Sequence, residues 1–139
     1  MDITARIRKE HQDVDGMLQE LSREYDKQLF KKLKLTLTAH MSAEEGTLYL
    51  AMAGREQDLV KRAEGEHQEI RKVLGRFLKG EASELSLLVS TLAEAVREHI
   101  KHEEQDVLPR AQEALEQEKV DELSYQFEQI EKRIIERSL

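Results

Sequence analysis

The sequence contains an internal repeat that restricts the folds open to it. Residues 9–14 (KEHQDV) resemble residues 65–70 (GEHQEI), and residues 40–45 (HMSAEE) resemble residues 99–104 (HIKHEE). The histidines of the two copies stand at offsets of 56 residues (11 to 67) and 59 residues (40 to 99). Self-similarity of this kind indicates that one structural unit occurs twice. We expect two similar helix pairs, packed about an approximate two-fold axis, with their equivalent histidines facing one another.

Composition favours helices over strands throughout the chain. Charged residues make up 37% of the 139 residues and aromatic residues only 4%, and the chain has six Gly and one Pro. So few turn residues exclude a fold built from many short strands. A chain of this length is expected to form one domain with a single core. Its formal net charge of −7 argues against a nucleic-acid binder, because such proteins are normally basic.

Apolar residues recur at intervals of three and four positions, which predicts amphipathic helices. The expected helices cover residues of about 3–24, 29–51, 57–78, 83–108 and 120–134. We expect Asp2 to cap the first helix, Gly54 to end the second in a left-handed conformation, and Pro109 to end or kink the fourth. Residues 1–115 are then an all-α, up-down-up-down four-helix bundle, and residues 116–139 are an additional C-terminal amphipathic helix packed on the bundle or extending it.

Four of the five histidines fall one to a helix, at nearly equal spacing. They are His11, His40, His67 and His99, and they are separated by 29, 27 and 32 residues. A chain that runs about 12 residues along one helix at ~1.5 Å each, makes a turn, and runs back along the next helix uses roughly 28 residues. In an up-and-down bundle each histidine therefore returns to the height of the one before it, and we expect all four in one layer.

Two of these histidines are followed, one turn later, by a glutamate on the same helix face. The pairs are His40–Glu44 and His99–Glu103. Both pairs share their face with leucines, so the carboxylates are expected in the core, where an ionised group is costly unless it is paired. Two divalent cations would pair them. Four imidazoles and two bridging carboxylates suit two iron ions, with manganese or zinc as other occupants, and the chain has no cysteine for a thiolate site.

Three neighbouring residues are expected outside this ligand set. His102 lies beside the seam between the helices, which favours a surface or supporting role. Glu45 and Glu104 directly follow the two paired glutamates and point about 100° away around the helix axis. Contact with solvent, or support of a ligand, therefore suits these two glutamates better than metal ligation.

The combination of motifs resembles the hemerythrin-like (HHE cation-binding) family. The resemblance covers residues of about 5–110 and rests on the order His, His-x-x-x-Glu, His, His-x-x-x-Glu, with Glu104 and then an apolar pair and Pro109 after the second motif. It implies a four-helix bundle that holds two iron ions with an oxo or hydroxo bridge. On this resemblance, His11 and His40 bind one iron, His67 and His99 bind the other, and Glu44 and Glu103 bridge them.

One position departs from the oxygen-carrying members of that family. Those proteins have a second histidine one turn after the third-helix ligand, and here that position is Arg71, which does not ligate iron. Each iron then keeps an exchangeable position, unless Asp15 or another nearby carboxylate closes one. Asp15 has the matching place one turn after His11, so an ion pair between Asp15 and Arg71 over the site is a second arrangement. Exchangeable positions favour redox chemistry with small molecules, or sensing, over reversible oxygen carriage.

These features predict a non-haem di-iron protein that binds dioxygen, nitric oxide or peroxide in an oxygen or redox stress response. Turnover of peroxide or nitric oxide is an activity that such a site would allow. Two other functions fit the same sequence: an iron-homeostasis sensor or iron-binding protein, and a metal-free helical interaction module. The sequence assigns no separate catalytic residues, no organic cofactor and no oligomeric state.

Nothing in the apolar pattern points to a membrane. The first ten residues hold no apolar run such as a signal peptide needs. The longest apolar stretches are far shorter than the ~20 residues that span a bilayer. We therefore expect a soluble, cytoplasmic protein whose partners are small molecules, with no nucleic-acid or membrane partner.

Overall fold

The computed structural model describes residues 1–138, which form helices and short connections with no strand among them. The expected all-α fold is therefore confirmed. The helical elements are α1 (Ile3–Arg23), α2 (Lys27–Glu44), η1 (Glu45–Tyr49), α3 (Leu50–Met52), α4 (Gln57–Arg76), η2 (Ala82–Glu84), α5 (Leu85–His102), η3 (Glu103–Val107), α6 (Leu108–Ala114) and α7 (Gln117–Ser138). Within the described part of the chain, no helix is both long and apolar enough to cross a membrane.

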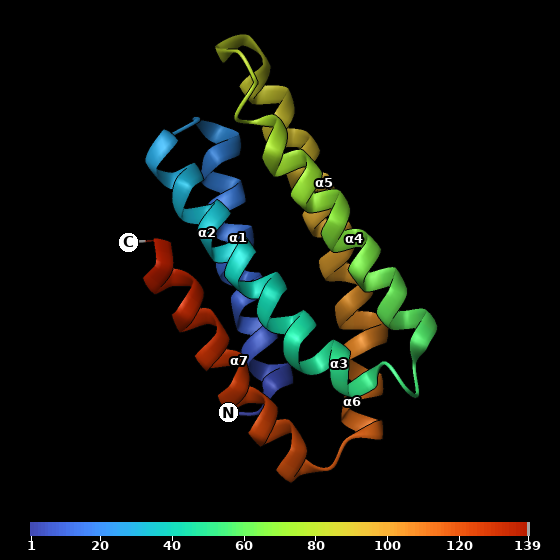
Figure 1. Cartoon of the computed structure of the whole chain (residues 1–139). Helices are drawn as coiled ribbons and strands as arrows, with labels where there is room; N and C mark the ends of the chain where they lie inside the picture. The colour runs from blue at the N-terminus through green and yellow to red at the C-terminus, as the bar shows by residue number, and fades with distance from the viewer. Residues whose placement is uncertain (139) are drawn as a thin grey trace.

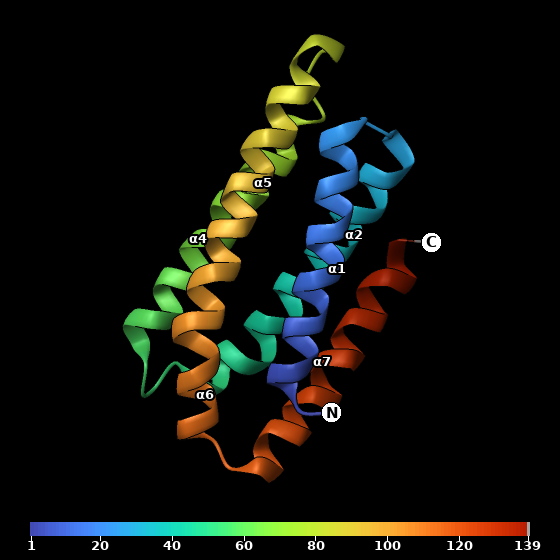
Figure 2. The ribbon, with the colours of Figure 1, turned by 180° about the vertical axis from the view of Figure 1, so that it is seen from behind.

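Several of these elements join end to end into longer rods. α2, η1 and α3 run without a break, and so do α5, η3 and α6. Together with α1 and α4 they form the expected bundle of four antiparallel rods, whose α4–α5 hairpin extends past the turn between α1 and α2 (Figure 1). Seen from behind, α7 lies along α1 and α2, away from α4 and α5 (Figure 2).

Aspartates begin the first two helices. The side chain of Asp2 accepts a hydrogen bond from the backbone N–H of Ala5, so the predicted cap is confirmed. Asp26 does the same for α2, accepting from the N–H groups of Gln28 and Leu29. Such caps satisfy N–H groups that have no partner inside the helix, and each contributes about 1 kcal/mol.

Two expected helix ends do not occur, at Gly54 and at Pro109, where a kink was the other expectation. No glycine among residues 1–138 has a positive φ, so Gly54 is not a left-handed cap. Pro109 does not end its helix either, because the chain continues through α6 to Ala114. Pro109 lies in the first turn of α6, directly after the π-helical turn η3. The regular α-helical hydrogen-bond pattern is already interrupted there, so the missing N–H group of Pro109 is tolerated.

A layer of histidines divides the apolar core in two. In α1, Ile7 belongs to one cluster of buried apolar residues and Val14 to the other, with His11 between them. One cluster draws mainly on α1, α2, α4 and α5, and the other on α1, the C-terminal end of α2, η1, α3, α4, η3, α6 and α7. Since burying one large apolar side chain is worth roughly 1.5–3 kcal/mol, these two clusters supply the stability that keeps polar groups fixed between them.

Helix α7 is packed firmly on the bundle. Val120, Leu123 and Phe127 belong to the second apolar cluster. The rings of Phe127 and His40 are packed in a T-shaped arrangement, with the ring centroids 5.8 Å apart and the planes at 79°. Phe127 is fully buried, so α7 covers one side of the histidine layer.

We predict that Phe127→Ala lowers the free energy of unfolding by about 3–5 kcal/mol, because the substitution leaves a cavity beside His40. Tyr125→Ala is the control, since Tyr125 on the same helix is 65% exposed and its loss should change stability by less than ~0.5 kcal/mol. Urea unfolding of both variants measures the difference. Equal effects would show that α7 contributes through helix formation alone and not through this contact.

Candidate metal centre

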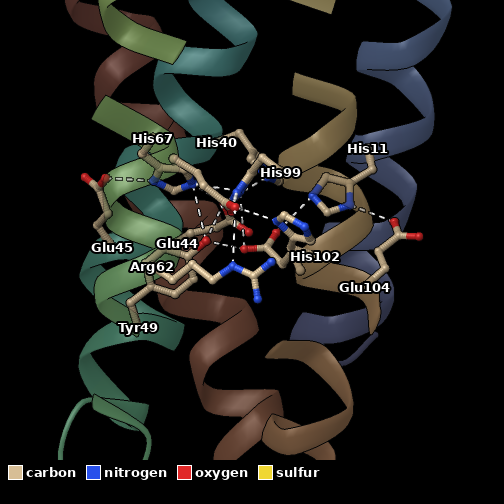
Figure 3. Close-up of polar contacts among 12 residues, drawn as sticks. His11, His40, Glu44, Glu45, Tyr49, Arg62, His67, His99, His102 and Glu104 are labelled. Atoms are coloured by element: carbon tan, nitrogen blue, oxygen red, sulfur yellow. Dashed lines mark hydrogen bonds and ion pairs between the residues drawn. The ribbon is translucent and has the colours of Figure 1, made fainter. Parts of the chain in front are cut away.

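Six buried side chains converge in the middle of the bundle (Figure 3). Ligand atoms of His11, His40, Glu44 and Glu103 lie within 4.8 Å of one another, and so do those of Glu44, His67, His99 and Glu103. All six side chains have at most 4% of their surface exposed. The two groups share both glutamates, which is the grouping that the sequence resemblance implied. Their role as metal ligands stays a prediction.

The helices place these residues through their regular geometry and through two irregular turns. His40 and Glu44 lie one turn apart on α2, and His99 and Glu103 are equally spaced on the α5 rod. Each glutamate stands at the junction with a π-helical turn, which is η1 in one half and η3 in the other. Turns of this type occur frequently at functional sites. Hydrophobic periodicity did not reveal them.

An outer set of four glutamates fixes the orientation of the four imidazoles. Each histidine Nδ1 lies 2.7–2.8 Å from a carboxylate: His11 from Glu104, His40 from Glu10, His67 from Glu45, and His99 from Glu66. Every one of these glutamates comes from the helix next to its histidine. Because a carboxylate accepts the Nδ1 proton, each Nε2 keeps its lone pair and can bind a metal ion.

The atoms that face the centre are poorly satisfied by the protein itself. His11 Nε2, His40 Nε2, Glu44 Oε2 and Glu103 Oε1 are buried and have no hydrogen-bond partner among the described residues. His11 Nε2 lies 3.0 Å from Glu103 Oε1, but not at a hydrogen-bonding angle. In the other half, the Nε2 atoms of His67 and His99 face each other at 3.1 Å.

A pair of divalent cations would satisfy all of these atoms. An unpaired buried polar atom costs about 1–3 kcal/mol, and two opposed nitrogen lone pairs repel each other. Imidazole nitrogens and carboxylate oxygens together suit iron, manganese or zinc. The residues present therefore fit the metal ions that the sequence implied.

The pKa values of the two shared glutamates are shifted strongly and in opposite directions. Burial, and then the neighbouring carboxylate of Glu103, raises the pKa of Glu44 well above its usual range. Burial acts on Glu103 in the same direction, but hydrogen bonds with Glu44 and His11 outweigh it and lower the pKa of Glu103 well below its usual range. With protein groups alone, this arrangement favours a proton on Glu44 over two ionised carboxylates. A cation bound between them would replace that proton.

Tyr49 is a site residue that the sequence reasoning missed. Its hydroxyl donates to Glu103 and lies 3.3 Å from His67 Nε2 and 3.5 Å from Glu44 Oε1. In an α-helix, a residue five positions after Glu44 would lie about 140° around the axis. The π-helical turn η1 brings Tyr49 back toward the face of Glu44. Burial, and then the charges of Glu44 and Glu103, raises the pKa of Tyr49 well above its usual value.

The residues expected outside the ligand set support it. Glu45 and Glu104 bind histidine Nδ1 atoms, as described above. His102 Nδ1 lies 2.5 Å from Glu66 Oε2, so this histidine supports the carboxylate that holds His99. The sequence reasoning did not predict the corresponding roles of Glu10 and Glu66, although both occupy equivalent positions of the repeat.

The ion pair between Asp15 and Arg71, which the sequence left open as one arrangement, does not form. Arg71 donates two hydrogen bonds to Glu45, at 2.8 and 2.9 Å, and Asp15 pairs with Arg97 at 2.9 Å. Asp15 belongs to neither ligand group. Burial alone would raise the pKa of Glu45, but hydrogen bonds from His67 and Arg71 outweigh it and lower this pKa to about 2. Arg71 therefore acts on the site through Glu45.

Helix α7 adds one more carboxyl to the outer set. Ligand atoms of Glu131, Glu10 and His40 lie within 4.8 Å of one another. Burial, and then hydrogen bonding to Glu10 and its charge, raises the pKa of Glu131 to about 8. Glu131 is thus protonated at neutral pH beside the carboxylate that holds His40.

Comparison with known proteins gives one match. The family model described as Hemerythrin HHE cation binding domain matches residues 2–111. No curated protein and no solved structure matches the chain. The matched segment contains all six converging residues and ends within α6, so α7 lies outside it.

We predict that Glu131→Gln changes how stability depends on pH. The folded-state pKa of about 8 lies above the ordinary value of 4.5, so the folded protein binds more protons than the unfolded chain between these values. The free energy of unfolding should therefore fall as pH rises from about 5 to 8. Glu131→Gln lacks this titrating carboxyl. Its free energy of unfolding relative to the parent should therefore increase between about pH 5 and pH 8 by roughly 1–2 kcal/mol, after allowance for the partial exposure of Glu131.

Urea unfolding of both proteins at pH 5.5 and pH 8.5 measures this difference. Parallel stability profiles for Glu131→Gln and the parent would contradict the proton assigned to Glu131.

Proposed function

Because the chain belongs to the hemerythrin HHE cation-binding family, we propose that it binds two iron ions in its buried histidine–glutamate layer. His11 and His40 would hold one ion and His67 and His99 the other. Glu44 and Glu103 would bind both. The four outer glutamates keep the histidines in the tautomer that binds metal.

One observation supports this proposal most strongly. The ligand atoms form two groups that share two carboxylates, and the atoms facing the centre include buried nitrogens and oxygens without partners. A buried histidine that stabilises a core normally has both ring nitrogens satisfied. Here the outer nitrogen of each ring is bonded. The inner nitrogens of His11 and His40 have no partner, and those of His67 and His99 face each other at 3.1 Å. Two cations explain this pattern in both halves at once.

The bound ions would react with small molecules. Iron held by nitrogen and oxygen ligands supplies redox chemistry and positions for dioxygen, nitric oxide or peroxide. Each proposed ion has four protein side chains, and Arg71, which stands where a further histidine would be needed to complete one ion, is engaged with Glu45. We infer a role in an oxygen or redox stress response, with turnover of peroxide or nitric oxide, in preference to reversible oxygen carriage.

The residues around the ions would control water and protons. The apolar clusters on either side of the layer exclude bulk water, which strengthens electrostatic interactions inside. Tyr49 holds a proton on its hydroxyl, because burial raises its pKa, and it donates that proton toward Glu103. It is placed to give a hydrogen bond to a small ligand that displaces this contact.

A role in iron homeostasis would use the same residues. In that function the ions themselves would be the signal, and the contact of α7 with His40 through Phe127 would connect the site to the rest of the molecule. In a metal-free interaction module, the inward-facing Nε2 atoms of His11 and His40 would stay buried without a partner. Metal analysis separates this last function from the other two.

We predict two iron ions per chain after anaerobic loading and desalting, measured by metal analysis. His67→Gln should reduce this number, because it removes a ligand that lies wholly inside the layer. His102→Gln should keep two ions, since the ionic contacts of His102 within residues 1–138 are with the carboxylates of Glu66 and Glu98 and not with the inner layer. A content near zero in the parent, or the same loss in both variants, would refute the proposed site.

A further inference from the structure

Three side chains that can bind metal meet outside the inner layer, where α7 packs against α1 and α2. Ligand atoms of Glu10, His40 and Glu131 lie within 4.8 Å of one another, and we call these three residues the outer triad. Each comes from a different helix, and α7 lies along the other two (Figure 2). Glu131 stands outside the segment that the family model matches. The family match therefore does not account for this group.

Two carboxyl groups are held against each other in the outer triad. Two ionised carboxylates so close together repel, and the proton that Glu131 retains, with its pKa of about 8, relieves this repulsion. A divalent cation would relieve it more completely, because both carboxylates attract it. Glu10 and Glu131 are half-buried, so an ion can reach them from solvent. Carboxylate oxygens and an imidazole nitrogen are suitable ligands for iron or manganese.

The other three outer glutamates stand beside cationic side chains. The pairs are Glu45 with Arg71 and Glu66 with Arg62, and Glu104 lines a groove together with Arg97 and Lys101. Positive charges at these three places repel an incoming cation. The neighbour that α7 gives to Glu10 is a second carboxyl instead. Among the four outer glutamates, Glu10 is therefore the one best placed to attract a metal ion.

One arginine lies near the outer triad but does not neutralise it. The charge of Arg6 acts on both Glu10 and Glu131. Its Nε donates to Ser124 Oγ at 3.1 Å, and its ionic contact within residues 1–138 is Glu128 at 3.5 Å. Arg6 therefore does not pair with Glu10 in the way that an arginine pairs with Glu45.

His40 belongs to both the outer triad and the inner layer. Its Nδ1 lies 2.7 Å from Glu10, and its Nε2 lies 3.1 Å from Glu44 Oε1 on the inner side. A neutral imidazole has one proton and one lone pair, so only one of its nitrogens binds an ion at a time. An ion on Nε2 leaves the proton on Nδ1, where Glu10 accepts it. The outer triad therefore loses its imidazole ligand once the inner ion is in place.

We propose that the outer triad is a loading site, at which a ferrous ion binds to Glu10, Glu131 and Nδ1 of His40 before it passes to the position between His11 and His40. His40 stays neutral during the transfer, because its proton moves from Nε2 to Nδ1 through water as the ion moves from Nδ1 to Nε2. The proton of Glu131 is released to solvent when the ion binds. Helix α7 thereby has a role in metal uptake. This inference rests on the proposed function.

The rate of iron uptake by the apoprotein tests the loading site. Apoprotein is mixed with Fe²⁺ anaerobically at pH 8, and uptake is stopped at set times with ferrozine, which captures the free ion. Glu131→Gln removes one carboxylate ligand and keeps the shape of the side chain. Glu122→Gln is the matched control, because Glu122 lies on the same helix with 55% of its side chain exposed and has its ionic contact with Lys119.

Glu131→Gln should slow uptake by about tenfold, since one of three ligands is lost, while Glu122→Gln should change the rate less than twofold. Both variants should reach two ions per chain, which also shows that they are folded. An unchanged or faster rate in Glu131→Gln, equal slowing in both variants, or a lower final content in Glu131→Gln alone would overturn the loading site. A parent that takes up no iron would overturn the proposed function as well.

A third variant separates ligation from attraction by charge. At pH 8 the imidazole of Glu131→His is neutral, so it can bind Fe²⁺ but adds no negative charge. Uptake by Glu131→His should therefore be within about threefold of the parent and faster than uptake by Glu131→Gln. Uptake as slow as that of Glu131→Gln would show that the charge at position 131 attracts the ion from a distance, and would overturn the role of Glu131 as a ligand.

Discussion

The cost of burying two carboxylates and four imidazoles between apolar clusters governs this structure. Glu44 and Glu103 are almost wholly buried, where an isolated ionised carboxylate would be strongly destabilised. The raised pKa of Glu44 favours its neutral form, which lowers this cost. Part of the cost remains, because several inward-facing atoms have no hydrogen-bond partner. Bound cations remove the remaining cost. We therefore expect metal binding and folding to be coupled in this chain.

The outer glutamates explain how the layer keeps its geometry. Each glutamate reaches from one helix to the histidine of its neighbour, so the four contacts form a closed ring around the bundle. The partners of the ring differ from one helix to the next: Glu45 has Arg71, Glu66 has His102, and Glu10 has Glu131 from α7. A repeated framework thus carries two groups of candidate ligands with different surroundings, which would allow two bound ions to have different roles.

The sequence predicted the features that depend on helix geometry alone. The spacing of His11, His40, His67 and His99 follows from the rise per residue, and the structure places all four in one layer. Tyr49 escaped prediction because a π-helical turn brings it to the site, and the periodicity of apolar residues does not reveal such a turn. Glu10 was also missed, since its partner lies on another helix and depends on how the helices pack. For the same reason the sequence could not decide whether Asp15 pairs with Arg71. The packing of the helices determines which charged residues meet, and it pairs Arg71 with Glu45 and Asp15 with Arg97.

Anomalous diffraction at the iron absorption edge, from crystals of the iron-loaded protein, tests the central claim most directly. The account predicts two peaks in one layer, one bounded by the Nε2 atoms of His11 and His40 and the other by those of His67 and His99, with Glu44 and Glu103 contacting both. A single peak would contradict a two-ion centre. Iron found only among Glu10, His40 and Glu131, with the inner layer empty, would contradict the assignment of the ligands.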